Sequence, residues 1–338
     1  LENKKYPYRL SICMIAKDEQ KYLGGCLSSI KPLLDSKTAE LIFVDTGSKD
    51  KTIEIAKKYT DKIYIHPWQN SFSEARNYSI SLANGEYILI LDADEELEKD
   101  SIKKLIELFN GDGYNQYSTY TFKEKNFSDK EHKIFSMLVR KAIFKNDGSF
   151  YYAGSVHNQP VSKLPLKNLD VTLLHYGYIM TPDIKDKKFK RTSSLLKREL
   201  KGNPQNIYYR FQLSVSYSMH GDNKEALEQV EIYLKLLENA DKKDINLMYY
   251  SNAALVYFNN SLHGRAIEIC DYVLELQPDF IDCIYFKAKA LFIKENYDEC
   301  IKVSRQYLNL LDEFSSHSIS NDDRYLFYSL GSKNDIFN

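Results

Sequence analysis

The stretch that most constrains this chain runs from Tyr87 to Glu96 and reads YILILDADEE. Five apolar or aromatic residues follow an Asn84-Gly85 turn and lead directly into a cluster of carboxylates. Such a run predicts a strand that is buried on both faces of a sheet and ends where the charges begin. Ligands of open α/β sheets bind outside the carboxyl ends of the strands, so we expect Asp92 and Asp94 at the rim of a ligand crevice.

A single residue separates Asp92 from Asp94, which suits a shared cation. Carboxylate oxygens are hard ligands of the kind that Mg²⁺ and Mn²⁺ prefer, and such an ion also binds a diphosphate. About one or two Asp-x-Asp triplets arise by chance in a chain so rich in aspartate, so the alternative is an ordinary solvated pair. The position after a buried strand is what favours the metal site.

Strands and helices alternate before and around this stretch. Three further apolar runs have the length of strands: residues 10–16, 40–44 and 62–66. The spacing of apolar residues between them predicts helices that begin near residue 23 and span 50–59 and 72–83, with Ser48 capping the second and Ser71 or Ser73 the third. This alternation predicts a mainly parallel sheet with right-handed crossovers.

Asp45 follows the second of these strands and begins the tight turn Asp45-Thr46-Gly47-Ser48. Because parallel strands share one carboxyl edge, we expect Asp45 on the same edge as Asp92 and Asp94. Neither G-x-x-x-x-G-K-[ST] nor G-x-G-x-x-G occurs, which argues against P-loop and dinucleotide-binding proteins and leaves the charge of a diphosphate to a metal. The alternative role of Asp45 is that of a plain turn residue.

The composition predicts a globular protein with no bulk charge. The chain has 338 residues, 43% of them hydrophobic, and 46 basic against 47 acidic side chains, which gives no field for nucleic acid or an anionic membrane. No run of about 18 apolar residues and no charged leader before an apolar stretch is visible, so we expect no membrane span. The cysteines are odd in number and lack metal-type spacing, which predicts core thiols in a reducing cytoplasm. They are Cys13, Cys26, Cys270, Cys283 and Cys300.

Four blocks, in this order, resemble the family 2 glycosyltransferases with a GT-A fold. They are SICMIAKDE, LIFVDTGSKDKT, FSEARNYSISLANGEYILILDADEEL, and VTLLHYGYI followed by KKFKR. The resemblance implies transfer of a hexose or N-acetylhexosamine from a UDP-sugar, with inversion at the anomeric carbon and with Mn²⁺ or Mg²⁺ as cofactor. Enzymes of this family with a similar later HYGY block also carry C-terminal tetratricopeptide repeats.

The resemblance also implies roles for individual residues. Asp45 would contact the base or ribose of UDP, Asp92 would lie near the ribose and the donor sugar, and Asp94 would bind the metal and act in catalysis. The residues implied in binding the donor nucleotide are Ala16, Asp45, Arg76, Asn77, Asp92 and Ala93.

Residues 114–178 are rich in aromatic and β-branched side chains, which predicts short, mostly antiparallel strands. The resemblance implies that these strands build the acceptor side. His157 and His175 lie near strand ends. His175 is a candidate metal ligand together with Asp94, and His157 is a candidate catalytic base, although a lone histidine is more often neither. The family usually has His-Glu where this chain has His157-Asn158, and asparagine cannot take a proton, so the glutamate's base role does not carry over.

The C-terminal half repeats a helix-pair pattern. A small residue recurs at Ala226, Ala266 and Cys300, with steps of 40 and 34 residues. The second step is the tetratricopeptide period, and the longer first step fits an insertion at 240–244. We therefore predict a GT-A domain at residues 1–198, helical repeats at 199–315, and a capping helix (325–330) and tail within 316–338. The repeats would bind a peptide or partner, or serve only in packing and dimerisation.

Together these features predict an inverting glycosyltransferase with a nucleotide-sugar donor and a protein or peptide acceptor. A solenoid offers more binding area than a monosaccharide needs, and a thiol acceptor needs less help from a base than a serine hydroxyl does. Three alternatives remain open. The chain could build a surface polysaccharide or lipopolysaccharide, act as a nucleotidyltransferase, or be an adaptor with an inactive domain that binds peptides through its repeats.

Overall fold

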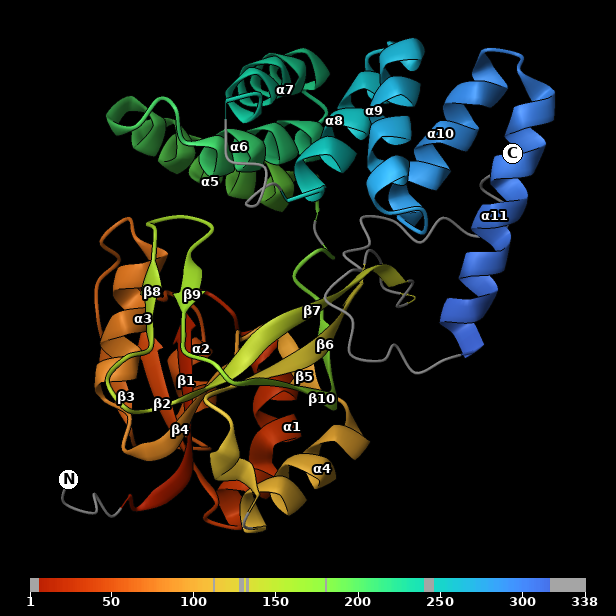
Figure 1. Ribbon diagram of the computed structural model, residues 1–338. Helices are drawn as coiled ribbons and strands as arrows, with labels where there is room; N and C mark the ends of the chain where they lie inside the picture. Colours follow the sequence, from red (N-terminus) through yellow and green to blue (C-terminus); the bar gives the residue numbers. More distant parts are fainter. Residues whose placement is uncertain are drawn as a thin grey trace. The chain divides into compact units, whose positions relative to one another are not determined.

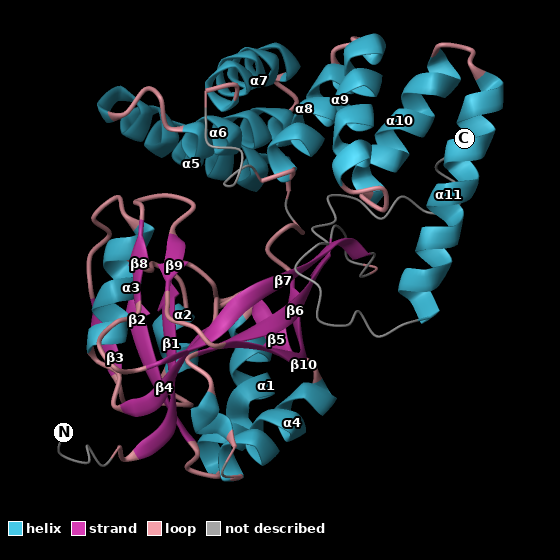
Figure 2. Cartoon of the chain, in the orientation of Figure 1, coloured by secondary structure: helices cyan, strands magenta, loops and turns pink. Residues whose placement is uncertain are grey.

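The computed structural model describes residues 6–111, 113–127, 131, 134–179, 181–239 and 246–316. The chain forms two compact units, Leu1–Ile179 and Met180–Asn338. Strands dominate the first unit and helices the second (Figures 1 and 2). This confirms the predicted fold class, an α/β GT-A domain followed by all-α repeats. The domain boundary at residue 198 stays a prediction; α5 (Pro182–Gly202) belongs to the second compact unit.

An eight-stranded sheet in the order β3-β2-β1-β4-β7-β6-β10-β5 organises the first unit. Its parallel part consists of β1 (Tyr8–Ala16), β2 (Ala39–Asp45), β3 (Ile63–Ile65) and β4 (Gly85–Ile90). β1 pairs in parallel with both β2 and β4. β1, β2 and β4 are buried almost throughout, as their apolar runs predict for strands covered on both faces.

The rest of the sheet is mostly antiparallel. It contains β5 (Glu95–Leu97), β6 (Thr119–Phe127), β7 (Ile134–Lys145) and β10 (Leu166–His175). β7 runs antiparallel to β4 and β6, whereas β10 runs parallel to β6. β8 (Tyr151–Ala153) and β9 (Gln159–Val161) form a separate antiparallel ribbon. The antiparallel pairing predicted for residues 114–178 is therefore confirmed, with the β6–β10 pair as its exception. The prediction that the strands are short holds only for β8 and β9, because β6, β7 and β10 have 9, 12 and 10 residues. Their place on the acceptor side stays a prediction.

Helices cover both faces of the sheet. α1 (Leu23–Asp35), α2 (Thr52–Ala56) and α4 (Lys99–Asn110) contribute to a core on one face. α3 (Phe72–Ser81) and β8 pack on the other face, beside the stacked rings of Phe144 and Phe150. A short 3₁₀ helix, Tyr114–Gln116, precedes β6.

The helix caps show where local prediction worked. Ser71 caps α3 as predicted, accepting a backbone hydrogen bond in its first turn. The prediction of Ser48 as the cap of α2 was wrong. Its hydroxyl accepts a hydrogen bond from the Asp18 amide, while Asp50 accepts one from the amide of Thr52 at 2.9 Å. α2 is accordingly shorter than the predicted helix over 50–59.

The second unit consists of α5 and three helix pairs in the described residues. The pairs are α6 (Ile207–His220) with α7 (Asn223–Leu237), α8 (Met248–Asn259) with α9 (His263–Leu276), and α10 (Ile281–Ile293) with α11 (Tyr297–Ser316). They confirm the predicted repeats. The predicted insertion at 240–244 and the predicted capping helix at 325–330 lie outside the described residues, as does the tail beyond residue 316.

The recurring small residue has a packing role. Ala226 and Ala266 are fully buried, and Cys300 is 8% exposed, each one turn into the second helix of its pair. Side chains of this size let the two helices of a pair approach closely. All five cysteines are buried free thiols, which confirms their predicted place in the core.

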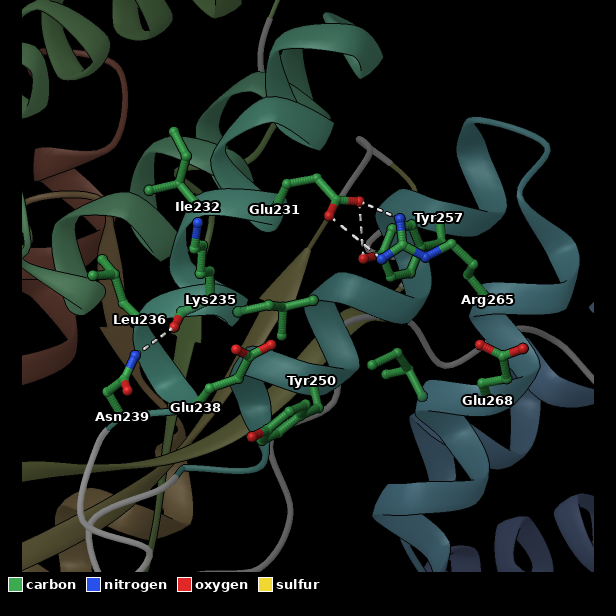
Figure 3. Close-up of a pocket in the computed structure, with 12 residues that line it drawn as sticks. Glu231, Ile232, Lys235, Leu236, Glu238, Asn239, Tyr250, Tyr257, Arg265 and Glu268 are labelled. Carbon is green, nitrogen blue, oxygen red and sulfur yellow. Dashed lines mark hydrogen bonds and ion pairs between the residues drawn. The ribbon is translucent and has the colours of Figure 1, made fainter.

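A groove of about 910 Å³ lies between α7 and α9, with α8 as its floor (Figure 3). At one end, Arg265 donates a hydrogen bond of 2.5 Å to Glu231 and lies over the ring of Tyr257. Ile232, which is 38% exposed, and Lys235 also line the groove. Its lining therefore mixes apolar, aromatic and charged groups of both signs.

Over the part of the chain that the structure describes, no helix combines the length and the apolar character needed to cross a bilayer.

Replacing Ala266 with leucine tests the packing role of the recurring small residue. Leucine has no room between the two helices, so we expect Ala266→Leu to lower the free energy of unfolding by about 1 to 3 kcal/mol. Glu268→Leu adds a similar side chain at an exposed position of the same helix and should change it by less than about 0.5 kcal/mol. Thermal melts of both variants measure this, and equal stabilities would contradict it.

Candidate functional site

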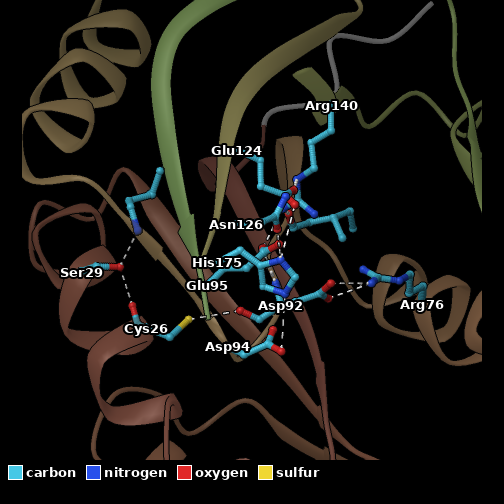
Figure 4. A network of polar contacts seen from close by, with 12 residues as sticks. Cys26, Ser29, Arg76, Asp92, Asp94, Glu95, Glu124, Asn126, Arg140 and His175 are labelled. Atoms are coloured by element: carbon cyan, nitrogen blue, oxygen red, sulfur yellow. Dashed lines mark hydrogen bonds and ion pairs between the residues drawn. The ribbon is translucent and has the colours of Figure 1, made fainter. Parts of the chain in front are cut away.

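The carboxyl edge of the parallel strands gathers the predicted acidic residues. β2 ends at Asp45, whose register partner on β1 is Ala16. β4 ends at Ile90, and the turn after it carries Asp92 and Asp94 (Figure 4). The buried strands of an open α/β sheet end at this edge, so the carboxylates can reach solvent while the strands stay buried.

Asp92 forms an ion pair with Arg76 of α3. Arg76 Nη2 lies 2.7 and 2.9 Å from the two carboxylate oxygens, and the guanidinium lies over the ring of Tyr152. Burial lowers the pKa of Arg76, but the charge of Asp92 outweighs it and raises the pKa above its ordinary value. Arg76 Nε is buried without a hydrogen-bond partner among the described residues. Asp92 is thus neutralised within the protein, and Arg76 keeps one unused donor.

Asp94 faces His175 at the end of β10. Asp94 Oδ2 and His175 Nε2 are 3.6 Å apart, too far for a hydrogen bond, and both side chains are largely buried. The Tyr176 amide donates to the Asp94 carbonyl at 2.9 Å, which ties the end of β10 to the turn after β4. A Cβ at Gly177 would collide with Asp94 Oδ2 and His175 Nε2. Glycine therefore keeps open the place beside these two potential ligand atoms.

Two polar residues of β6 support His175 from behind. Its Nδ1 lies 2.5 Å from Asn126 Oδ1 and 3.4 Å from Glu124 Oε1. An Nδ1–H that donates to Asn126 leaves Nε2 directed at Asp94. Burial lowers the pKa of His175, but Asp94 and Glu124 outweigh it and raise the pKa well above its ordinary value.

Arg140 of β7 links two buried carboxylates. Its Nη2 lies 2.7 Å from Glu95 Oε2, and its Nε lies 3.1 Å from Glu124 Oε2. Burial opposes ionisation of Glu124, but Arg140 and His175 outweigh it and hold its pKa below the ordinary value. Burial raises the pKa of Glu95, with Arg140 acting in the opposite direction. Glu95 Oε2 also accepts a hydrogen bond of 2.9 Å from the Asp92 amide.

Glu95, Glu124 and His175 form a cluster whose potential ligand atoms lie within 4.8 Å of one another. Sequence reasoning missed Glu95, Glu124, Asn126 and Arg140. The signal was present as charged and amide residues inside strand-length runs, TFKEKNF and MLVRKAIF. Such residues resemble the solvated face of an amphipathic strand, and only the pairing of β6 with β7 brings them together.

Asp45 combines a turn role with an unused oxygen. Its Oδ2 accepts hydrogen bonds from the amides of Gly47 at 2.9 Å and Ser48 at 3.0 Å. Its Oδ1 is buried without a hydrogen-bond partner among the described residues. A buried carboxylate oxygen without a partner is costly, so this atom is a candidate for a ligand's donor group.

Asn77 and His157 were predicted to meet the donor and the acceptor. The Asn77 amide donates to the Tyr152 carbonyl at 2.9 Å and accepts from the Tyr152 amide at 2.8 Å, so both of its polar groups hold β8. Its contact with a nucleotide stays a prediction. His157 lies at an exposed position between β8 and β9, and nearby protein atoms lower its pKa through desolvation. Its ring is therefore neutral near pH 7, and the lowered pKa makes it a weaker base than an ordinary histidine.

Ala16 and Ala93 are both buried at this edge, at 5% and 3% exposure. The structure thus brings Ala16 and Asp45 together on neighbouring strands, and Asp92, Ala93 and Asp94 into one turn with Arg76 and His175 nearby. Asn77 and His157 flank the β8–β9 ribbon. Chemically, this edge offers a carboxylate and an imidazole nitrogen for a cation, and unpaired acceptor and donor atoms for a polar ligand.

Two family models match the chain. Residues 11–165 match "Glycosyl transferase family 2", and residues 219–306 match "Anaphase-promoting complex, cyclosome, subunit 3". The chain therefore contains a family 2 glycosyltransferase domain followed by a region of tetratricopeptide-type repeats.

Curated relatives agree with this division. Glycosyltransferase SunS, derived from the SPbeta prophage of Bacillus subtilis, is 24% identical over 83% of this chain and 66% of its own length. A TPR repeat-containing protein of Synechococcus elongatus is 47% identical over 26% of this chain and 21% of its own length. The chain thus spans less than two thirds of each of these relatives.

Solved structures give weaker likenesses. S. aureus TarS 1–349 in complex with UDP-GlcNAc has a TM-score of 0.41 and 12% identity, with 94% of this chain and 95% of that chain covered. MamA has a TM-score of 0.34 and 19% identity, with 40% of this chain and 78% of that chain covered. Neither likeness carries an argument about function.

Proposed function

We propose that the chain is an inverting, metal-dependent glycosyltransferase that takes its sugar, a hexose or N-acetylhexosamine, from a UDP-sugar. The observation that carries the proposal is the pair of Asp94 and His175 at the carboxyl edge of the sheet, beside Asp92 and Arg76, within a family 2 domain. The alignment with the glycosyltransferase SunS over 83% of the chain supports it.

Asp94 and His175 are the residues that would hold Mn²⁺ or Mg²⁺, and on metal binding His175 would give up the proton that Asp94 and Glu124 stabilise in the free site. A carboxylate oxygen and an imidazole nitrogen suit a divalent ion of this kind, and the hydrogen bond of His175 Nδ1 to Asn126 is the outer support that metal-binding histidines need. The glycine at 177 leaves room beside both ligand atoms. When bound, the ion would neutralise the charge that develops on the departing UDP.

Protein groups around this pair would bind and orient the donor. The unused Oδ1 of Asp45 can accept a hydrogen bond from the base or ribose of UDP. Arg76, held by Asp92, has an unused Nε–H for the ribose or the donor sugar. Ala16 and Ala93 have small side chains and would let the nucleotide approach the ends of the strands closely. Asn77 would contact the nucleotide indirectly, through β8, whose backbone Asn77 binds.

The acceptor would attack the anomeric carbon from the face opposite UDP. We assign the base role to His157, because Asn158 at the next position cannot take a proton. The lowered pKa of His157 leaves its ring neutral near pH 7 and makes it a weak base, which suits an acceptor that is already partly ionised. We propose a protein or peptide side chain as acceptor, because the repeat unit has a groove of about 910 Å³ lined by tyrosines and charges of both signs. Peptide-binding solenoids use surfaces of this kind.

Three rival functions give different products. A polysaccharide-building enzyme would transfer sugar to a saccharide and not to a peptide. A nucleotidyltransferase would release pyrophosphate and not UDP. An adaptor with an inactive domain would bind peptides without turning over any nucleotide-sugar. Analysing the products from a set of nucleotide-sugars and candidate acceptors separates all four.

Replacing Asp94 with asparagine tests the proposed metal site. Asp94→Asn keeps the size of the side chain and removes a charged ligand at the rim, so transfer and metal-dependent UDP binding should be lost while the variant remains folded. Asp100→Asn, at an exposed position of α4, is the control and should behave as the wild type. Near-normal turnover of Asp94→Asn with a confirmed donor would contradict the assignment.

Replacing Asp45 with asparagine tests its proposed contact with UDP. The asparagine oxygen can still accept from the turn amides, whereas its NH₂ group replaces the unused acceptor oxygen with a donor. UDP and UDP-sugar should both bind more weakly by about 1 to 3 kcal/mol, with KM rising more than kcat falls. Calorimetry with UDP measures this. Unchanged affinity would leave Asp45 with its turn role alone.

Replacing Ile232 with aspartate tests the proposed acceptor groove. A charge on the groove wall should lower kcat/KM for a peptide acceptor tenfold or more, about 1.4 kcal/mol, and leave hydrolysis of the UDP-sugar unchanged. Met219→Asp is a matched control, because Met219 is 40% exposed on the same unit and does not line the groove. Equal effects of the two substitutions on transfer would contradict the role of the groove.

A further inference from the structure

The buried cluster of Glu95, Glu124 and Arg140 has no part in the chemistry described so far. Glu95 and Glu124 are 2% and 8% exposed at their side chains, and they come from different segments of the chain. Burying two carboxylates costs several kcal/mol unless a cation and hydrogen bonds compensate. The place of such a costly cluster beside the proposed ligand-binding edge indicates that the cluster has a role there.

Arg140 supports the turn that carries Asp92 and Asp94. Its Nη2 lies 2.7 Å from Glu95 Oε2, and the same oxygen accepts the Asp92 amide at 2.9 Å. Nη2 also lies 3.5 Å from the carbonyl of Ile90, the last residue of β4. The guanidinium therefore contacts the turn on both sides of Asp92, through a side chain and through the backbone.

Arg140 also supports His175. Its Nε forms an ion pair with Glu124 Oε2 at 3.1 Å, without the geometry of a hydrogen bond, and the other oxygen of Glu124 lies 3.4 Å from His175 Nδ1. Glu124 and Asn126, which both lie on β6, thus hold the Nδ1 side of the His175 ring. Figure 4 shows Arg140 on one side of this group, with Glu124 and Asn126 between it and His175, and Asp94 on the far side of the ring.

The cluster of Glu95, Glu124 and His175 has the ligand atoms of a second divalent-cation site. Its two carboxylates, however, already share a guanidinium at 2.7 and 3.1 Å. A planar guanidinium with several donors can span two carboxylates at once, which a compact ammonium cannot do. Arg140 therefore holds the position that an inner cation would need, and only the outer face, between Asp94 and His175, offers a place for a metal.

We propose that Arg140 is a positioning residue for the metal site: its guanidinium fixes the turn of Asp94 through Glu95 and fixes His175 through Glu124. This inference rests on the proposed function, because it assumes a cation between Asp94 and His175. It assigns Arg140 no contact with substrate. Outer supports of this kind typically change metal affinity by about 10-fold to 100-fold when they are removed.

Arg140→Lys is the variant that tests it. Lysine keeps the positive charge, so the electrostatic field at the metal is retained, but it cannot bridge both carboxylates and the Ile90 carbonyl. Arg9→Lys is the matched control: Arg9 pairs with Glu86 on the same sheet, its side chain is 56% exposed, and it has no contact with the site. Circular dichroism melts establish that both variants are folded.

Binding of Mn²⁺ alone to the full chain is the first readout, measured by titration calorimetry without any donor. We expect Arg140→Lys to bind Mn²⁺ about 10-fold or more weakly and Arg9→Lys to bind as the wild type does. Amide hydrogen exchange is the second readout and needs no metal. The Asp92 amide should exchange faster in Arg140→Lys than in the wild type or in Arg9→Lys.

The outcomes separate the two proposals. Equal Mn²⁺ affinity and equal Asp92 exchange in wild type and Arg140→Lys would overturn the role of Arg140 and leave the proposed function intact. Failure of the wild type to bind Mn²⁺, with or without UDP, would overturn the proposed metal dependence and the role of Arg140 with it. Weaker Mn²⁺ binding together with faster Asp92 exchange, in Arg140→Lys only, supports the assignment.

Discussion

The central strands of the sheet are buried on both faces, and this constraint decides where the chain can place charged functional side chains. β1, β2 and β4 are buried almost throughout, and an unpaired charge inside them would cost several kcal/mol. Glu40 of β2 illustrates the rule, because its buried carboxylate accepts hydrogen bonds from Lys62 at 2.5 Å, from Ser11 at 2.5 Å and from the Asn84 amide at 2.7 Å. Acids without such a partner lie where the strands end, and Asp45, Asp92 and Asp94 accordingly gather along one edge of the sheet.

The features that the sequence predicted are those with a local cause. A continuous apolar run is enough to define β4 and the place of Asp92 and Asp94 after it, because a strand that is buried on both faces has apolar residues at consecutive positions. The helix pairs of the second unit follow from a repeated small residue, since Ala226 and Ala266 are both fully buried where two helices meet. In each case the signal lies within a single element or a single period of the repeat.

The features that could not be predicted depend on partners far away in the sequence. Glu124 and Arg140 come together only through the antiparallel pairing of β6 and β7. Arg140 also pairs with Glu95, which lies 45 residues earlier in the chain. Asn77 has a polar side chain of the kind that often contacts ligands, yet both of its polar groups bind the backbone of Tyr152, 75 residues later in the chain. Ser48 precedes α2 as a cap would, but the Asp18 amide takes its hydroxyl. Each of these outcomes depends on tertiary contacts that no local pattern records.

The contacts also divide the acidic groups of the edge by their electrostatic state. Arg76 neutralises Asp92, and Arg140 compensates Glu95 and Glu124, so three of the carboxylates are balanced by fixed guanidinium groups. Asp94 instead faces His175 at 3.6 Å, a separation that leaves space between a carboxylate oxygen and an imidazole nitrogen. If arginine neutralised every carboxylate at this edge, none would be available to bind a cation. If arginine neutralised none of them, repulsion between the carboxylates would destabilise the edge. Fixed guanidinium groups thus balance three of the carboxylates and leave Asp94 opposite an imidazole, which is the arrangement that the proposed metal site would use.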